Sequence, residues 1–201
     1  MIIYLATNNK HKLKEVNEIK PKNFEIKGMF EILKNFEVNE DGKTFLENSI
    51  KKAIETAHVL RTPVISDDSG LEIEILNGFP GIYSARFMEN KSYKEKMKHI
   101  LKKLENVPFE KRNARFVCVA TYFDPKNNIL FSVEGEVRGK IAYSILGKKG
   151  FGYDPIFIPE GETLTFGQLG EEVKNKISHR KRAFQKLFSI LLNIPKLEII
   201  S

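Results

Sequence analysis

MIIYLATNNKHKLKE, residues 1–15, places a short apolar run directly before a polar segment rich in lysine and asparagine. The apolar run is typical of a β-strand, and apolar residues then recur at helical spacing from Leu13 to Ile19. Pro21 ends that pattern, because proline interrupts a helix. The stretch therefore predicts a strand, a tight loop and a helix, which is the first unit of an α/β protein.

Further along the chain, strand-like and helix-like segments alternate at first, and strand-like segments then follow one another. We predict strands at 24–30, 62–66, 71–76, 114–123 and 128–137. We predict helices at 44–60, 92–104 and 171–193, the second of them capped by Ser92. The sequence NGFPG predicts a turn, and DPKNN predicts a hairpin. This order favours a mixed β-sheet flanked by helices, in a single domain of residues 1–201 with two lobes around a cleft.

Composition places the chain among globular proteins. Of its 201 residues, 41% are hydrophobic and 29% are charged, which excludes the disordered class. No apolar run approaches the roughly 20 residues that span a bilayer. The first residues carry neither a basic segment nor a cleavage signal. We therefore expect a cytoplasmic protein without a membrane partner.

The formal net charge of +7 raises the local concentration of anions and favours a phosphate-bearing partner. Basic residues recur among apolar ones at helical spacing in KHKLK, EKMKHILKK and SHRKR. This pattern is typical of solvated helix faces, and no nucleic-acid module is recognised in it. The only cysteine, Cys118, lies in an apolar run, so the sequence predicts a buried, inert thiol and no intrachain disulfide.

The polar segment after the first strand fits a helix start that binds phosphate. If the helix begins near Asn8 or Asn9, its first backbone N–H groups and its dipole favour an anion. Thr7 and Asn9 would donate to the phosphate. Lys12 would face the same anion, and Glu15, one turn further, would hold Lys12. The alternative is an ordinary helix cap with a surface lysine–glutamate pair.

Two adjacent carboxylates, Asp67 and Asp68, stand at the end of a predicted strand in VISDDSG. Mg²⁺ prefers one or two carboxylates together with waters and substrate phosphates. Because successive side chains of a strand point to opposite sides, one carboxylate would bind the metal while the other orients or deprotonates water. Glu40, or Glu37 in its place, would complete the metal site. The alternatives are an Asx-turn at the aspartates and a merely solubilising acidic loop.

The glycine-rich stretch GKKGFGYDPIFIP, residues 147–159, favours contact with a nucleoside. Glycines allow a backbone to approach a ligand closely, and Phe151 or Tyr153 offers a ring on which a base stacks. Asp154 would be a fixed hydrogen-bond acceptor. The alternative is a loop that lines the core.

The segment KNKISHRKR, residues 174–182, lies on the predicted last helix. Lys174 and Ser178 share one face of that helix, and His179 and Arg180 follow directly. The histidine–arginine pair has two interpretations, a solvated surface and a functional contact.

Four stretches together resemble the Ham1-like inosine triphosphate pyrophosphatase family, and the likeness runs over nearly the whole chain. They are TNNKHKLKE, SDDSGLEIEILNGFPGIYSARF, GFGYDPIF and ISHRKRAF. The resemblance implies hydrolysis of non-canonical purine nucleoside triphosphates (ITP, dITP and XTP) to the monophosphate and pyrophosphate, with Mg²⁺ and with Mn²⁺ as an alternative. It also implies an elongated mixed α/β fold with two lobes, a central substrate cleft and a homodimer.

The resemblance further implies roles for the matching residues. Asp68 would activate water, and Lys12 would stabilise the departing pyrophosphate. The residues implied in substrate binding are Thr7, Asn8, Asn9, Lys10, His11, Lys12, Lys52, Ser69, Arg86, Phe151, Gly152, Tyr153, Asp154, Lys174, His179 and Arg180. Those implied in metal binding are Glu40, Asp67 and Asp68, and the choice between Glu40 and Glu37 stays open.

Selection against ATP requires discrimination at position 6 of the purine, where hypoxanthine and xanthine carry an oxygen and adenine an amino group. Donors such as Arg180 or protonated His179 would favour the oxygen and exclude adenine, although they do not exclude guanine. Two rival interpretations are a nucleic-acid-binding protein and an enzyme of the related Maf type, which acts on pyrimidine or methylated nucleotides. The sequence SHR favours the Ham1-like interpretation over the Maf type.

Overall fold

The computed structural model describes residues 2–193, and its centre is a six-stranded sheet in the order β2-β1-β3-β4-β5-β6. Met1 and residues 194–201 of the predicted domain lie outside the described residues. The strands are β1 (Ile2–Leu5), β2 (Glu25–Gly28), β3 (Val64–Ile73), β4 (Asn113–Asp124), β5 (Ile129–Ile141) and β6 (Phe157–Pro159). β1 is parallel to β2 and β3, and the other neighbours are antiparallel. The predicted mixed sheet is therefore confirmed.

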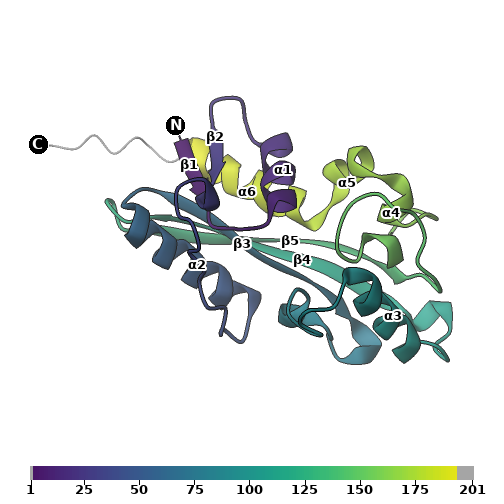
Figure 1. Cartoon of the computed structure of the whole chain (residues 1–201). Helices are drawn as coiled ribbons and strands as arrows, with labels where there is room; N and C mark the ends of the chain where they lie inside the picture. The colour runs from purple at the N-terminus through teal and green to yellow at the C-terminus, as the bar shows by residue number, and fades with distance from the viewer. Residues whose placement is uncertain (1, 194–201) are drawn as a thin grey trace, which may run out of the picture.

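Helices cover both faces of this sheet, and the molecule is elongated along its three long strands (Figure 1). The helices are α1 (Lys10–Ile19), α2 (Phe45–Leu60), α3 (Tyr93–Lys103), α4 (Phe166–Leu169), α5 (Glu171–Ile177) and α6 (His179–Asn193). α1 and α6 lie on one side of the sheet and α2 lies on the other (Figure 1). Because β1 and β3 are parallel neighbours, the start of α1 lies beside the middle of β3.

Side-chain caps fix where the helices begin. The Asn9 side-chain oxygen accepts hydrogen bonds from the N–H groups of His11 and Lys12, which satisfies two donors of the first turn of α1. Ser92 and Glu95 form a capping box at the start of α3. Both helix starts are where the sequence predicts them.

β3 corrects the sequence prediction, because the two strands expected at 62–66 and 71–76 are one continuous strand. The strand pairs with β4 from Val64, opposite Phe123, to Ile73, opposite Ala114. Continuous pairing leaves no strand end in this region. The two aspartates of VISDDSG therefore lie in the middle of a strand.

The last predicted helix, 171–193, is also wrong, because it is divided into α5 and α6. Ser178 between them has an extended backbone, with φ −66° and ψ 157°. Its hydroxyl accepts a hydrogen bond of 3.2 Å from the N–H of Lys181, as a cap for α6. The short elements β6 and α4 are absent from the sequence prediction.

Two large apolar clusters form most of the core, beside two smaller ones under α2, and the large clusters lie in different parts of the molecule. The first joins α1 and α6 to the sheet through residues such as Ile3, Val16, Ile65, Phe184 and Leu187. The second joins α3 and the segment around β6 to the other end of the long strands, through residues such as Leu71, Ile73, Ile100, Ile156 and Phe166. These clusters are the cores of the two lobes that the resemblance implies.

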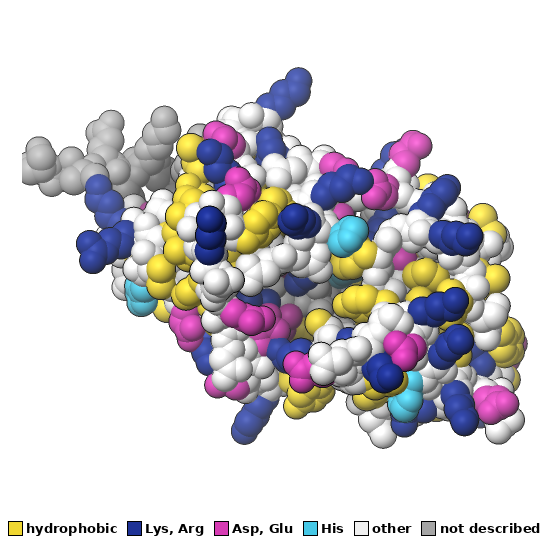
Figure 2. Space-filling model, viewed as in Figure 1, with side chains coloured by type: hydrophobic (Ala, Val, Ile, Leu, Met, Phe, Trp, Pro, Cys, Tyr) yellow, Lys and Arg dark blue, Asp and Glu magenta, His cyan; other side chains and the backbone are white. Residues whose placement is uncertain are grey.

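The face of the molecule drawn in Figure 2 is charged without a single dominant patch. Figure 2 shows lysine and arginine side chains spread over one face, interspersed with acidic and apolar ones. Within residues 2–193, no helix has the length and apolar character that crossing a bilayer requires.

Two leucines of α6 provide a test of the first core cluster. Leu187 has 0% exposure and Leu192 has 52%. We expect Leu187→Ala to lower the free energy of unfolding by about 2–5 kcal/mol, because it leaves a cavity between α6 and the sheet. The matched variant Leu192→Ala should change it by less than about 1 kcal/mol. Urea unfolding monitored by circular dichroism measures both, and equal effects would contradict this packing.

Candidate active site

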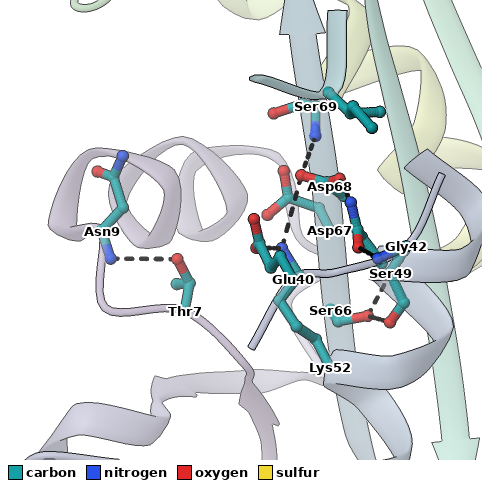
Figure 3. A network of polar contacts seen from close by, with 12 residues as sticks. Thr7, Asn9, Glu40, Gly42, Ser49, Lys52, Ser66, Asp67, Asp68 and Ser69 are labelled. Carbon is teal, nitrogen blue, oxygen red and sulfur yellow. Dashed lines mark hydrogen bonds and ion pairs between the residues drawn. The ribbon is translucent and has the colours of Figure 1, made fainter. Parts of the chain in front are cut away.

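The loop between β1 and α1 holds the polar segment that the sequence singles out. The Thr7 hydroxyl accepts a hydrogen bond of 3.1 Å from the N–H of Asn9, which closes the loop onto the helix start. Figure 3 shows Thr7 and Asn9 on this loop, joined by that hydrogen bond. The ammonium of Lys12, within the first turn of α1, lies 3.1 Å from the carboxylate of Asp67.

Asp67 is completely buried and pairs with two cations. Its Oδ2 lies 3.1 Å from Lys12 Nζ and 3.0 Å from Arg180 Nη2. Burial raises the pKa of Asp67, but the charges of Lys12 and Arg180 outweigh that effect and hold the pKa well below its usual range. Cys118 lies beside this carboxylate, and burial raises the pKa of its thiol. The cysteine is buried, as predicted.

Glu15 corrects the expected pairing with Lys12. Its carboxylate instead binds Arg180 Nη1 at 2.5 Å and Lys174 Nζ at 2.7 Å. Lys174 also lies 2.6 Å from Oδ2 of Asp154, so alternating charges run from Asp67 to Asp154. Burial by itself would raise the pKa of Glu15. The charges of Arg180 and Lys174 lower the pKa by more than burial raises it, so the net pKa lies below its ordinary value. Five separate segments of the chain supply these charges, namely β3, α6, α1, α5 and the turn Asp154–Ile156.

Asp68 has different surroundings, on the side of α2. The ammonium of Lys52 bridges the carboxylates of Glu40 and Asp68, and lies 3.7 Å from Oδ1 of Asp68. Arg86 binds the other oxygen of Glu40. Figure 3 shows Glu40, Lys52 and Asp68 directed toward one another. Burial raises the pKa of Asp68, and the charges of Lys52 and Lys12 reduce that rise without cancelling it.

Aromatic rings gather where the sequence predicts nucleoside contact. Phe151 stacks on His11 with 5.2 Å between ring centroids, and Lys174 Nζ lies 4.2 Å from the Phe151 centroid. The Tyr153 hydroxyl is occupied, because it donates to the carbonyl of Ser84 at 2.6 Å.

His179 departs from the sequence prediction in its charge. Its ring is buried and stacks on Phe116 with 4.9 Å between centroids. Burial lowers the pKa of His179 well below its ordinary value, and the neighbouring cations Arg180 and Lys174 lower it further. The predicted protonated His179 is therefore wrong for neutral pH, where the imidazole is neutral.

Most predicted site residues meet at one cleft, which encloses about 110 Å³. Those that line it are Asn9, Lys12, Glu40, Asp68, Ser69, Phe151, Gly152, Tyr153, Asp154, Lys174, His179 and Arg180. Other predicted residues contact this lining without belonging to it. Lys52 and Arg86 bind Glu40, and Asp67 binds Lys12. Thr7 bonds to Asn9, and His11 stacks on Phe151.

The remaining predicted residues lie outside this arrangement. The Asn8 amide donates to the carbonyl of Phe36 at 3.1 Å, and Lys10 is exposed. Glu37 is also exposed, whereas Glu40 lines the cleft, so the geometry favours Glu40 of the two.

Sequence reasoning missed Tyr93 and Phe116, which also line the cleft, and Asn48, which bonds to Asp68. Tyr93 and Phe116 carry no local signal beyond being aromatic. Asn48 was detectable as a polar residue within the apolar stripe of its predicted helix.

The donor set of the cleft fits a hard divalent cation. Among residues 2–193, no three acidic, histidine or cysteine side chains gather in a preformed metal cluster. Two carboxylates, Glu40 and Asp68, share one ammonium, and Mg²⁺ requires no more than two carboxylates when waters and phosphates complete its shell. The contacts of Asp67 with Lys12 and Arg180 favour a counter-ion role over the ligand role predicted for it.

A larger hollow, of about 680 Å³, lies elsewhere on the sheet, beside Arg115 and Arg138. None of the predicted site residues appears in its lining within residues 2–193. Its arginines are already paired with carboxylates, since Arg115 binds Glu72 and Glu136 at 2.7 Å each and Arg138 binds Glu136 at 2.8 Å. Volume therefore does not identify the reactive site here, and the smaller cleft holds the unusual electrostatics.

Solved structures of the same architecture place this arrangement in a known class. The Ham1 protein of Staphylococcus aureus has a TM-score of 0.86 and 40% identity, covering 97% of this chain and 100% of that one. A HAM1 protein from Coxiella burnetii has a TM-score of 0.86 and 35% identity, covering 96% and 98%. The fold is thus that of Ham1 proteins.

Sequence comparison gives the family. Residues 3–190 match the Ham1 family. The dITP/XTP pyrophosphatase of Dictyoglomus thermophilum is 46% identical over 92% of each chain, and that of Bacillus subtilis is 42% identical over 93% of this chain and 95% of its own. The chain belongs to the Ham1 family.

Two glutamates of α1 test the buried charges. Glu15 is held by two buried cations, whereas Glu18 forms an exposed pair with Lys14 at 3.8 Å. We expect Glu15→Gln to lower the free energy of unfolding at pH 7 by about 3–5 kcal/mol, because it leaves buried cations underpaired. Glu18→Gln should cost less than about 1 kcal/mol.

The pH dependence of the free energy of unfolding tests whether Glu15 acts through its charge. The folded pKa of Glu15 is lowered, so its contribution is complete above the ordinary glutamate pKa of about 4.3 and is lost as pH falls through the folded value. Urea unfolding at pH 7 and pH 3 should show the gap between wild type and Glu15→Gln shrink at the lower pH. A gap that is constant with pH would contradict an ionic role.

Proposed function

We propose that the protein hydrolyses non-canonical purine nucleoside triphosphates (ITP, dITP and XTP) to the nucleoside monophosphate and pyrophosphate. This activity would remove deaminated purines from the nucleotide pool. The observation that carries the proposal is a cleft in which one carboxylate with a raised pKa, Asp68, lies among the cations Lys12 and Lys52. The names of the dITP/XTP pyrophosphatases related to the chain support the same substrate class.

In the proposed reaction, water attacks the α-phosphorus and Asp68 accepts the proton. A bond forms between the water oxygen and the α-phosphorus, and the bond from that phosphorus to the bridging oxygen of the β-phosphate breaks. Pyrophosphate departs with the electron pair. A base with a raised pKa suits this step, because proton transfer is most effective when the pKa of the base lies near the working pH.

Cations at the start of α1 would bind the triphosphate. A triphosphate repels any nucleophile through its negative charge, so that charge must be neutralised as pyrophosphate leaves. Lys12 lines the cleft beside Asp68, and the positive end of the α1 dipole adds to its field. Ser69 lies on the same side of the cleft. Lys52 and Arg86 would supply further positive charge behind Glu40.

Glu40 and Asp68 would hold Mg²⁺, with Mn²⁺ as a possible substitute. The ion, when bound, would neutralise phosphate charge and polarise the phosphorus–oxygen bonds. The lysine ammonium between the two carboxylates supports a cation site here. Asp67 would act behind them as the counter-ion that orients Lys12.

The base would bind at the opposite end of the cleft, where Phe151 offers a ring for stacking. Gly152 and Tyr153 line the same cleft, as do Asp154 and Lys174, which pair with each other. Arg180, a permanent donor, would favour the 6-oxygen of hypoxanthine or xanthine over the amino group of adenine. Neutral His179 would contribute one donor and one acceptor.

The same family likeness leads us to propose a homodimer located in the cytoplasm. Light scattering coupled to gel filtration would measure the mass of the protein in solution, and a mass equal to one chain would overturn the proposed homodimer. On the face that Figure 2 shows, lysines and arginines are dispersed among acidic and apolar side chains, so this face does not present the continuous basic patch that nucleic-acid binding uses.

Product analysis tests the proposed function. Purified protein would be incubated with ITP, XTP, ATP, GTP and CTP, with Mg²⁺ and with chelator, and products separated by ion-exchange chromatography. We expect metal-dependent release of pyrophosphate together with IMP or XMP, and little turnover of ATP, GTP or CTP. Release of inorganic phosphate and nucleoside diphosphate, or no turnover by folded protein, would overturn the proposal. CTP turnover in preference to ITP would favour the Maf type.

Asp68→Asn tests the proposed base. We expect turnover to fall by about 10²–10⁴-fold, which is the usual contribution of general-base catalysis. The raised pKa of Asp68 means that the folded state disfavours its ionised form, so the variant should unfold at the same or a higher temperature at pH 7. The exposed Asp41, in the same acidic region, supplies the control Asp41→Asn.

The wild-type pH profile tests the same group independently. Because the reaction requires the ionised form of the base, turnover should fall as the pH is lowered. Near-normal turnover of folded Asp68→Asn would remove Asp68 from this role.

A further inference from the structure

Asn48 lies on the buried face of α2 with 0% exposure, and its side-chain amide bonds in two directions. The amide oxygen accepts a hydrogen bond of 2.8 Å from the N–H of Gly42. The amide nitrogen donates a hydrogen bond of 3.0 Å to Oδ2 of Asp68. The orientation of the amide is fixed, because the Gly42 N–H only donates and a carboxylate only accepts.

These two bonds connect the parts of the cleft that must act together. Gly42 belongs to the acidic loop two residues after Glu40, and Asp68 belongs to β3. With Oδ2 held by Asn48, the other oxygen of Asp68 accepts from the N–H of Ser69 at 3.0 Å and lies 3.7 Å from Lys52 Nζ. One buried amide thus bonds both to the Asp68 carboxylate and to the loop that carries Glu40.

The approach of the loop to Asn48 is too close for a side chain at position 42. A Cβ atom on Gly42 would lie 2.6 Å from the side-chain oxygen of Asn48 and 2.8 Å from Cβ of Glu47. Gly42→Ala would therefore separate the loop from the amide. The bond between Asn48 and Asp68 would not be touched directly by that change.

Lys52 of the same helix also joins Glu40 to Asp68, whereas Ser49 has no such connection. The Ser49 hydroxyl lies 3.1 Å from Ser66 and 2.8 Å from Thr121, and these contacts hold the helix on the sheet. Figure 3 shows Ser49 and Ser66 bonded to each other beside Asp67 and Asp68. Ser49 is therefore a buried polar residue of the same helix without a bond to Asp68.

We propose that Asn48 is a positioning residue for the reaction, which fixes the Asp68 carboxylate and the Glu40 loop in one relative geometry. The inference rests on the proposed function. Misplacement of a catalytic group by about 1 Å costs on the order of 10²-fold in rate, so loss of the amide should appear in kcat. Substrate binding should change little, because Asn48 lies behind the cleft and does not appear in its lining.

The experiment compares Asn48→Ala, Gly42→Ala and Ser49→Ala with wild type. For Asn48→Ala we expect kcat for ITP to fall by about 100-fold with KM within about twofold. Gly42→Ala should lower kcat with a smaller effect, because it disturbs only the loop. Ser49→Ala should keep the wild-type kcat while lowering the melting temperature, as a merely structural residue does.

Hydrogen exchange of the acidic loop gives a readout that needs neither substrate nor metal. Exchange in the peptide containing residues 37–44 should accelerate in Asn48→Ala and Gly42→Ala and match wild type in Ser49→Ala. An unchanged kcat in folded Asn48→Ala, with active wild type, would overturn this inference while leaving the proposed function intact. Inactive wild type would overturn the proposed function instead. Hydrogen exchange of residues 37–44 that is the same in Asn48→Ala as in wild type would, in that case, overturn the anchoring of the loop by Asn48.

Discussion

The buried carboxylate of Asp67 is the constraint on which the arrangement of this molecule depends. A carboxylate without solvent access costs several kcal/mol unless cations and donors surround it. β3 cannot supply them, so Lys12 comes from α1 and Arg180 from α6. Both helices lie on the same side of the sheet, and each sends a cation to the same oxygen, Oδ2 of Asp67. The two cations that neutralise Asp67 also line the cleft.

Adjacent positions on a strand then give two carboxylates two different chemistries. Asp67 faces α1 and α6 and is held ionised by the cations there, whereas Asp68 bonds to Asn48 of α2 and has a raised pKa. The alternation of side chains along a strand produces this separation without any special backbone geometry. Pairs of titratable groups whose environments move their pKa values apart are a usual basis for dividing catalytic roles.

Local signals in the sequence predicted much of the fold. The caps at Asn9 and Ser92, the hairpin and the mixed sheet follow from short patterns, and the structure has them. The continuity of β3 was not predictable in this way, because polar residues within a strand are tolerated only when distant partners bury them. Ser178 likewise interrupts a helical pattern through its backbone and a cap that periodicity does not reveal.

The site was predictable in its membership and less so in its pairings. Residues of four motifs meet at one cleft, yet Glu15 binds Arg180, 165 residues away in the chain, and not its neighbour Lys12. The polar Asn48 stands out within an apolar helix face, but its bond to Asp68 could not be predicted, because Asp68 is 20 residues away in the chain. Spacing identifies candidates, whereas charge pairing is decided by which distant elements pack together.

The contact between Glu15 and Arg180 also bears on how the chain folds. It joins α1, the first helix, to α6, the last helix that the structure describes, and such distant contacts form slowly because a long loop must close first. Until α6 docks, Asp67 lacks one of its two cations and the sheet lacks the apolar face of α6. The contacts of α6 therefore complete two things at once, the first apolar cluster and the cation set around Asp67, so core packing and site assembly depend on the same helix.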